Sequence, residues 1–137
     1  MADTGYGYTT KISGLSFDDV VEKTTEALKT QGFGVITEID VKATMKKKLD
    51  IDYRNYKILG ACNPKFAHQA LGEDLFIGLL LPCNVAVFDD DEGSVTVSLV
   101  KPEEMFKVVD KPELAPIAAG VGERLRAVLG QLQELRG

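Results

Sequence analysis

Cysteine is scarce in this sequence: its 137 residues include only Cys62 and Cys83. A secreted domain that depends on disulfides has a denser set of cysteines, so we expect a reducing compartment. The first residues lack the charged and apolar regions of a signal peptide, and no Asn-X-Ser/Thr acceptor for glycosylation occurs. These absences predict a cytoplasmic protein.

Long apolar runs and basic patches are missing as well. No run of about 18 apolar residues occurs, which is what a membrane-spanning helix needs. The net charge is −5, and the one basic run, Lys46-Lys47-Lys48, has no aromatic residues between its lysines. Such a run is typical of a solvated helix end, where lysines suit the negative end of the helix dipole. We therefore expect neither a membrane span nor a nucleic-acid partner.

Catalytic signatures are absent too. Nothing resembles a nucleophile elbow, a phosphate-binding loop or a C-x-x-C pair. Gly5-Tyr6-Gly7 and Gly120-Val121-Gly122 are isolated triplets that do not link a strand to a helix, and the acidic turn at 89–93 lacks the register of a calcium loop. No residue set identifies a catalytic site or a cofactor, and whether the protein is an enzyme stays open.

The hydrophobic pattern predicts one folded unit. Apolar residues make up 45% of the chain, enough for a single domain over residues 1–137 to build a core without disulfides. Helices are predicted over 16–31, 40–48, 63–71 and roughly 24 residues from Leu114, with strands over 8–13, 33–39, 53–62, 79–88 and 95–99. We expect an α+β fold: a two-layer sandwich with a largely antiparallel sheet packed by the first and last helices. Pro82 predicts an edge position or a bulge.

The last helix has the clearest pattern. Apolar residues recur at spacings of four and three: Leu114, Ala118, Val121, Leu125, Val128, Leu132 and Leu135. A helix of about 24 residues is about 36 Å long, more than one sheet needs as cover. We expect its far end, at Leu132 and Leu135, to contact a second copy in a homodimer.

Two cysteine-containing segments are the candidates for chemistry. Asn63 has the character of an N-cap with Pro64 at the first helical position, so Cys62 precedes the positive end of a helix, where a thiolate is stabilised. The second segment is Pro82-Cys83-Asn84. Antiparallel strands bring the two cysteines together, whereas a parallel crossover places them roughly 20 Å apart. Three interpretations of Cys62 and Cys83 stay open: small buried hydrophobic residues, thiols that react or contact a ligand, and metal ligands.

His68 is the single histidine. It follows Cys62 by six positions, about 9 Å along a helix, which is too far for a Cys–His dyad. It also lies away from the apolar stripe of its helix, so we expect a surface residue. A metal-binding trio of Cys62, His68 and Cys83 has suitable ligand types, but its spacing matches no standard motif.

Four segments resemble a known family: Gly60-Ala61-Cys62-Asn63-Pro64, Gly78-Leu79-Leu80-Leu81-Pro82-Cys83-Asn84-Val85, Lys111-Pro112-Glu113-Leu114 and Gly14-Leu15-Ser16-Phe17. From about Tyr6 to Leu132, the chain is similar to the bacterial and archaeal domain-of-unknown-function family 302. The resemblance implies a compact α+β domain, often a homodimer, and no activity. It therefore supplies no catalytic residues.

Our functional hypothesis is a non-enzymatic homodimeric module that binds a small ligand or a partner. The alternative is a thiol-based redox or soft-metal-binding protein that uses Cys62 and Cys83. We expect no catalytic residues, no metal ligands and no cofactor. The candidate ligand-binding residues are Cys62, Asn63, Pro64, Pro82, Cys83 and Asn84.

Overall fold

A computed structural model describes residues 4–135. Five antiparallel strands form one sheet in the order β1-β5-β4-β3-β2. The elements in chain order are β1 (Gly7–Ile12), α1 (Phe17–Thr30), β2 (Gly34–Asp40), α2 (Val41–Leu49), β3 (Tyr56–Cys62), α3 (Pro64–Glu73), the 3-10 helix η1 (Leu75–Leu80), β4 (Cys83–Asp89), β5 (Val95–Val100), α4 (Pro102–Met105), the 3-10 helix η2 (Phe106–Val108) and α5 (Leu114–Gln133). The α+β class and the antiparallel sheet are as predicted.

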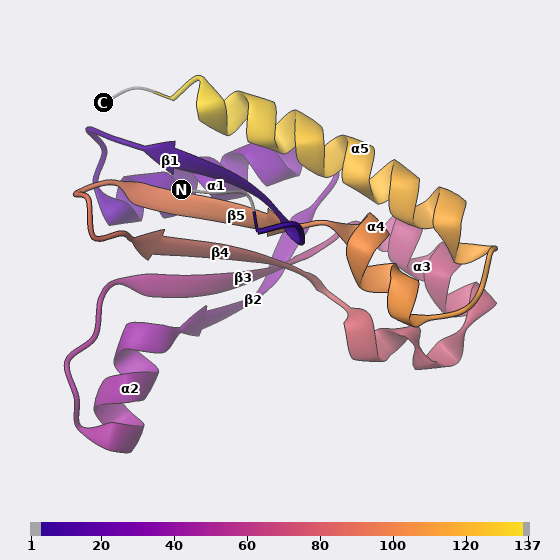
Figure 1. The fold of residues 1–137 in the computed structure, drawn as a ribbon, viewed down its shortest axis with the longest axis horizontal. Helices are drawn as coiled ribbons and strands as arrows, with labels where there is room; N and C mark the ends of the chain where they lie inside the picture. The colour runs from indigo at the N-terminus through magenta and orange to yellow at the C-terminus, as the bar shows by residue number, and fades with distance from the viewer. Residues whose placement is uncertain (1–3, 136–137) are drawn as a thin grey trace.

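Helices cover one face of this sheet. Leu59 of β3 pairs with Val85 of β4, which pairs with Leu99 of β5. These three side chains are at most 1% exposed. α1 packs against β2, β4 and β5, while α5 packs against β1 and α1. Figure 1 shows α5 running along β1, with α1 behind the strands. The main core therefore lies between the sheet and these two helices.

The first helix forms for the reasons that its sequence indicates. The Ser16 hydroxyl accepts a hydrogen bond from the Asp19 N–H at 3.0 Å, and Asp18 and Asp19 lie in the first turn. At the other end, Gly32 has a φ of +84°, the left-handed conformation that ends many helices. The predicted boundaries, Ser16 and Gln31, are the two cap residues of α1.

The apolar side of the last helix packs against the core of its own chain. It spans 20 residues, about 30 Å, rather than the expected 24. Leu132 is 1% exposed, and Leu135 packs against the main core. The prediction that Leu132 faces a partner is therefore wrong, since this side chain is buried in the main core of its own chain. Leu135 is only partly buried, and its contact with a second copy stays a prediction.

The strand predicted over 79–88 begins only at Cys83. The residues before it form η1, which starts where the Asp74 carboxylate accepts a hydrogen bond from the Phe76 N–H at 2.9 Å. The prediction of an edge position or a bulge at Pro82 is also wrong. Its strand, β4, is central, and Pro82 precedes the first ladder residue, so its missing N–H costs no ladder bond.

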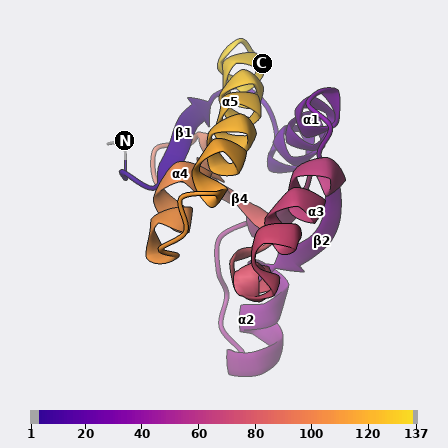
Figure 2. The same cartoon turned by 90° about the vertical axis from the view of Figure 1, so that its right-hand side faces the viewer.

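A second apolar cluster lies at one end of the sheet. It consists of Ala70, Ile77, Phe106, Leu114 and Ala118. At this end, α3 and α4 both pack against α5, as Figure 2 shows, while α2 extends from the opposite end of the sheet (Figure 1). Among residues 4–135, no helix is both long enough and apolar enough to cross a membrane.

Candidate functional site

A cavity of about 300 Å³ lies at the corner where β3 ends and β4 begins. Apart from one asparagine and two cysteines, every residue that lines it is apolar. The lining residues are Phe33, Ile36, Ala61, Cys62, Asn63, Phe66, Ala67, Ala70, Leu71, Leu81, Pro82, Cys83, Phe106, Ile117 and Val121. The cavity is thus a lipophilic space with few polar groups.

The cavity marks the junction of the two apolar clusters. Phe33, Cys83 and Val121 belong to the main core, whereas Ala70 and Phe106 belong to the second cluster. All five line the cavity. Between them α3 forms a wall, because it packs on α5 and η1. The space is therefore a gap where two separately packed regions of one chain meet.

A glycine in α5 allows α3 to come this close. A Cβ atom at Gly120 would lie 2.8 Å from Cε1 of Phe66, well inside van der Waals contact. The guanidinium of Arg124, one turn further along α5, lies 5.6 Å from the centroid of the Phe66 ring. The Phe66 ring thus occupies the space left by the missing side chain while it lines the cavity.

The two cysteines meet at this cavity. Ala61 of β3 is paired with Cys83 of β4, so the antiparallel ladder brings Cys62 next to the start of β4. Both are free thiols; Cys62 is half-buried and Cys83 is buried. Burial, and then the neighbouring Cys62, raise the pKa of Cys83 to about 12. Cys83 therefore stays protonated at neutral pH.

Asn63 occupies the N-cap position of α3, and Pro64 is its first helical residue. The Asn63 carbonyl accepts a hydrogen bond from the Ala67 N–H at 3.0 Å. The side chain does not cap the helix; its amide donates to the Gln31 carbonyl at 3.3 Å. Asn63 thus joins the start of α3 to the end of α1, beside Gly32.

Of the six candidate residues, four line the cavity: Cys62, Asn63, Pro82 and Cys83. The other two, Pro64 and Asn84, are exposed and do not contribute to its lining. Asn84 follows Cys83 in β4, and successive strand residues point to opposite faces of a sheet. The three aromatic rings in the lining, Phe33, Phe66 and Phe106, were not among the candidates.

His68 is exposed on α3 and lies outside the cavity lining. Within the part of the chain that the structure describes, no group of three or more histidine, cysteine or acidic side chains is arranged to hold a metal ion. The trio of Cys62, His68 and Cys83 is therefore not assembled.

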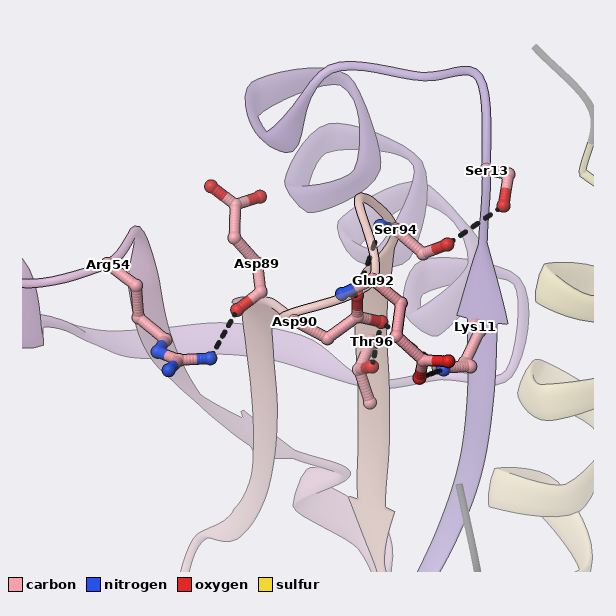
Figure 3. Close-up of polar contacts among 8 residues, drawn as sticks. All are labelled: Lys11, Ser13, Arg54, Asp89, Asp90, Glu92, Ser94 and Thr96. Atoms are coloured by element: carbon pink, nitrogen blue, oxygen red, sulfur yellow. Dashed lines mark hydrogen bonds and ion pairs between the residues drawn. The ribbon is translucent and has the colours of Figure 1, made fainter.

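The acidic turn between β4 and β5 is held by Asp90, whose contacts appear in Figure 3. One carboxylate oxygen accepts hydrogen bonds from the N–H groups of Glu92 (2.8 Å) and Ser94 (3.0 Å), and the other accepts from the Thr96 hydroxyl at 3.0 Å. Burial alone would raise the pKa of Asp90, but these hydrogen bonds and the nearby Lys11 ammonium outweigh it and lower the pKa. The carboxylate organises the turn.

A polar cluster joins β1, α4 and α5, and sequence reasoning missed it. The Tyr8 hydroxyl lies 2.9 and 2.8 Å from the two Glu103 carboxylate oxygens, and the Arg126 guanidinium donates to both residues. A Cβ atom at Gly122 would lie 2.3 Å from a Glu103 oxygen, so the glycine makes room for the carboxylate. Sequence separations of up to 118 residues hide this cluster from local patterns.

The fold places the chain in the α+β class: helices cover one face of an antiparallel sheet, and an apolar cavity lies at the end of that sheet. Residues 8–132 match the family model described as Domain of unknown function DUF302, so the chain belongs to the DUF302 family. The predicted resemblance is confirmed.

A solved structure agrees with this assignment. The crystal structure of an uncharacterized conserved DUF302 protein from Bacillus stearothermophilus is similar, with a TM-score of 0.84 and 31% sequence identity. The similarity covers 92% of this chain and 97% of that chain. A comparison with curated proteins found no match.

Proposed function

We propose that this protein is a non-enzymatic module that binds a small molecule in the cavity between its two apolar clusters. The observation that carries the proposal is the lining of this space of about 300 Å³, which is apolar except for one asparagine and two cysteines. Ligand sites are typically concave, largely apolar and few per protein, and their volumes begin near this value. No acidic, basic or hydroxyl side chain lines the cavity, so it lacks the usual groups for acid–base catalysis.

Cys62, Asn63, Pro82 and Cys83 are the proposed ligand contacts among the candidate residues. Pro64 and Asn84 complete the proposed region as neighbours: Pro64 fixes the start of α3, and Asn84 follows Cys83 in β4. A ligand that fills the gap would contact both clusters at once, so binding should stabilise the folded chain.

Thermal-shift screening against a metabolite collection tests this proposal. We expect a hit to raise the unfolding temperature of the wild type and to lose its effect in Ala67→Phe, which fills the cavity from α3. Ala119→Phe, at an exposed position of α5 outside the cavity lining, is the matched control and should keep the shift. Hits that act equally on both variants would show that binding occurs elsewhere.

We also propose a homodimer, formed through the edge of the sheet. β2 is an edge strand and pairs only with β3 among the described residues. Its Ile36 and Ile39 side chains are 63% and 50% exposed. An edge strand is a template for a further strand, and pairing with its own copy gives a closed, two-fold assembly. Ile36 also lines the cavity, so the second copy would lie near the ligand.

A thiol-based redox or soft-metal-binding function is the second candidate. It is favoured by the position of Cys62 and Cys83 at one cavity and opposed by the raised pKa of Cys83. Thiol titration of the native protein before and after mild oxidation tests the thiol function. Joint loss of both thiols on oxidation supports it, and two thiols that react only in denaturant contradict it; alkylation of Cys62 alone is expected under either function.

We propose the cytoplasm as the site of action. Both cysteines are free thiols, which suits a reducing compartment. Fractionation of cells that express the tagged protein would test this, and recovery from a membrane or extracellular fraction would contradict it.

A further inference from the structure

The walls of the cavity restrict the chemistry of its ligand. Three aromatic rings line it, and each comes from a different segment: Phe33 just before β2, Phe66 in α3 and Phe106 in η2. Aliphatic side chains such as Leu71 and Ile117 complete the lining. Aromatic rings bury large apolar areas and favour other rings in offset or edge-to-face contact.

The cavity offers nothing that would balance a charge. No acidic or basic side chain lines it. The amide of Asn63, its one strongly polar side chain, already donates to the Gln31 carbonyl. An ion that loses its hydration without a partner pays a desolvation penalty that apolar contacts do not offset. The raised pKa of Cys83 agrees with this environment, because burial there disfavours the ionised thiol.

The cavity opens to solvent beside Ile36, which is 63% exposed, so its volume sets the size of the part of the ligand that is buried. A space of about 300 Å³ holds roughly ten groups the size of a water molecule, each about 30 Å³ in the liquid. We infer that the ligand is an uncharged, apolar molecule about the size of two fused aromatic rings. This inference rests on the proposed function, since it names the class of molecule that the same cavity binds.

A matched pair of probes tests the inference. Naphthamide and naphthoate have the same fused rings and nearly the same shape, but only naphthoate is charged at neutral pH. We expect naphthamide to raise the unfolding temperature and to slow alkylation of the half-buried Cys62. Naphthoate should bind more than tenfold more weakly. Calorimetric titration with each probe gives the two affinities.

The cavity variants separate the possible failures. Binding of naphthamide should disappear in Ala67→Phe and in Ile117→Phe, and should persist in Ala119→Phe. Two blocking variants are used so that poor folding of one does not decide the result. If both probes bind equally and both are lost in the blocking variants, the proposed function stands and the inferred ligand class is wrong.

Two other outcomes overturn the inference differently. If naphthamide binds the blocking variants as well as the wild type, it binds outside the cavity, and the inferred ligand class is wrong. If neither probe binds the wild type, the inferred class and size are wrong, while the metabolite screen still tests the proposed function independently.

Discussion

Ala61 of β3 lies directly across the ladder from Cys83 of β4, and this pairing brings the neighbouring Cys62 to the same cavity. The two thiols nevertheless have different surroundings. Cys83 is 7% exposed and belongs to the main core. Cys62 is half-buried and precedes the first turn of α3. Their reactivities should therefore differ.

We predict that Cys62 is alkylated faster than Cys83, by more than about tenfold near neutral pH, because Cys62 is only half-buried whereas burial keeps Cys83 protonated. Cys62→Ser should abolish most fast labelling by iodoacetamide, and Cys83→Ser should leave it nearly unchanged. Mass spectrometry of each site gives the rates. If Cys83 reacts first, or if both react only after unfolding, the predicted difference in reactivity is refuted.

Two glycines of α5 should respond oppositely to alanine. Gly122→Ala places a methyl group against the Glu103 carboxylate, which is held by Tyr8 and Arg126. We expect the free energy of unfolding to fall by about 1–3 kcal/mol. Gly130→Ala meets no atom within 4 Å and should gain up to about 1 kcal/mol from helix propensity. Urea unfolding measures both changes. Equal effects at the two positions would contradict the role of Gly122.

Asp90→Ala should destabilise the protein by roughly 1–3 kcal/mol at neutral pH, because three hydrogen bonds to the carboxylate are lost. The folded-state pKa of Asp90 is lowered, so its contribution is complete above the unfolded pKa of about 3.9 and disappears as the pH falls through the folded pKa. The difference between wild type and Asp90→Ala should therefore shrink below about pH 4. Chemical denaturation at neutral and acidic pH measures it.

Asp91→Ala is the control for this turn. The Asp91 side chain is 86% exposed and pairs only at the surface with Arg54, at 3.0 Å. We expect the free energy of unfolding to change by less than about 1 kcal/mol, since exposed ion pairs contribute little to stability. A larger effect at Asp91 than at Asp90 would show that the outer charges, rather than the buried carboxylate, hold the turn.

Sedimentation equilibrium tests the dimer and its surface. We expect Ile39→Lys, on the β2 edge, to reduce the mass to that of one chain, because it places a charge in the proposed interface. Leu79→Lys, on the exposed η1 surface where Leu79 is 86% exposed, should leave the dimer intact. A monomeric wild type at tens of micromolar refutes the dimer, and dissociation by Leu79→Lys alone would place the interface on η1 instead.

Local sequence patterns predicted most of the fold because most of its elements are stabilised locally. Ser16 and Gly32 mark the ends of α1, and the α5 seam identifies the buried face of that helix. The run before Pro82 was misassigned because a short apolar segment fits a strand and a 3-10 turn equally well. Only the Asp74 carboxylate, which caps η1, distinguishes them.

The site was only partly predictable, and for a different reason. Cys62 and Cys83 were named because of their sequence context, yet their proximity depends on the register of β3 with β4. The cavity itself depends on a close approach between Gly120 and Phe66, which lie 54 positions apart in the printed sequence. A cavity between two packed regions has no sequence motif, because its shape depends on how side chains from distant segments pack in the folded chain.

The division of the apolar interior into two clusters also has a kinetic consequence. The cluster around Ala70 and Phe106 does not share its residues with the strand ladder, so it can open as a cooperative subunit while the sheet stays intact. Amide hydrogens of α3 should then exchange with deuterium well before those of β4. Opening of this cluster without global unfolding would then widen the entrance to the proposed site, and the opening rate would limit how long a ligand bound there stays.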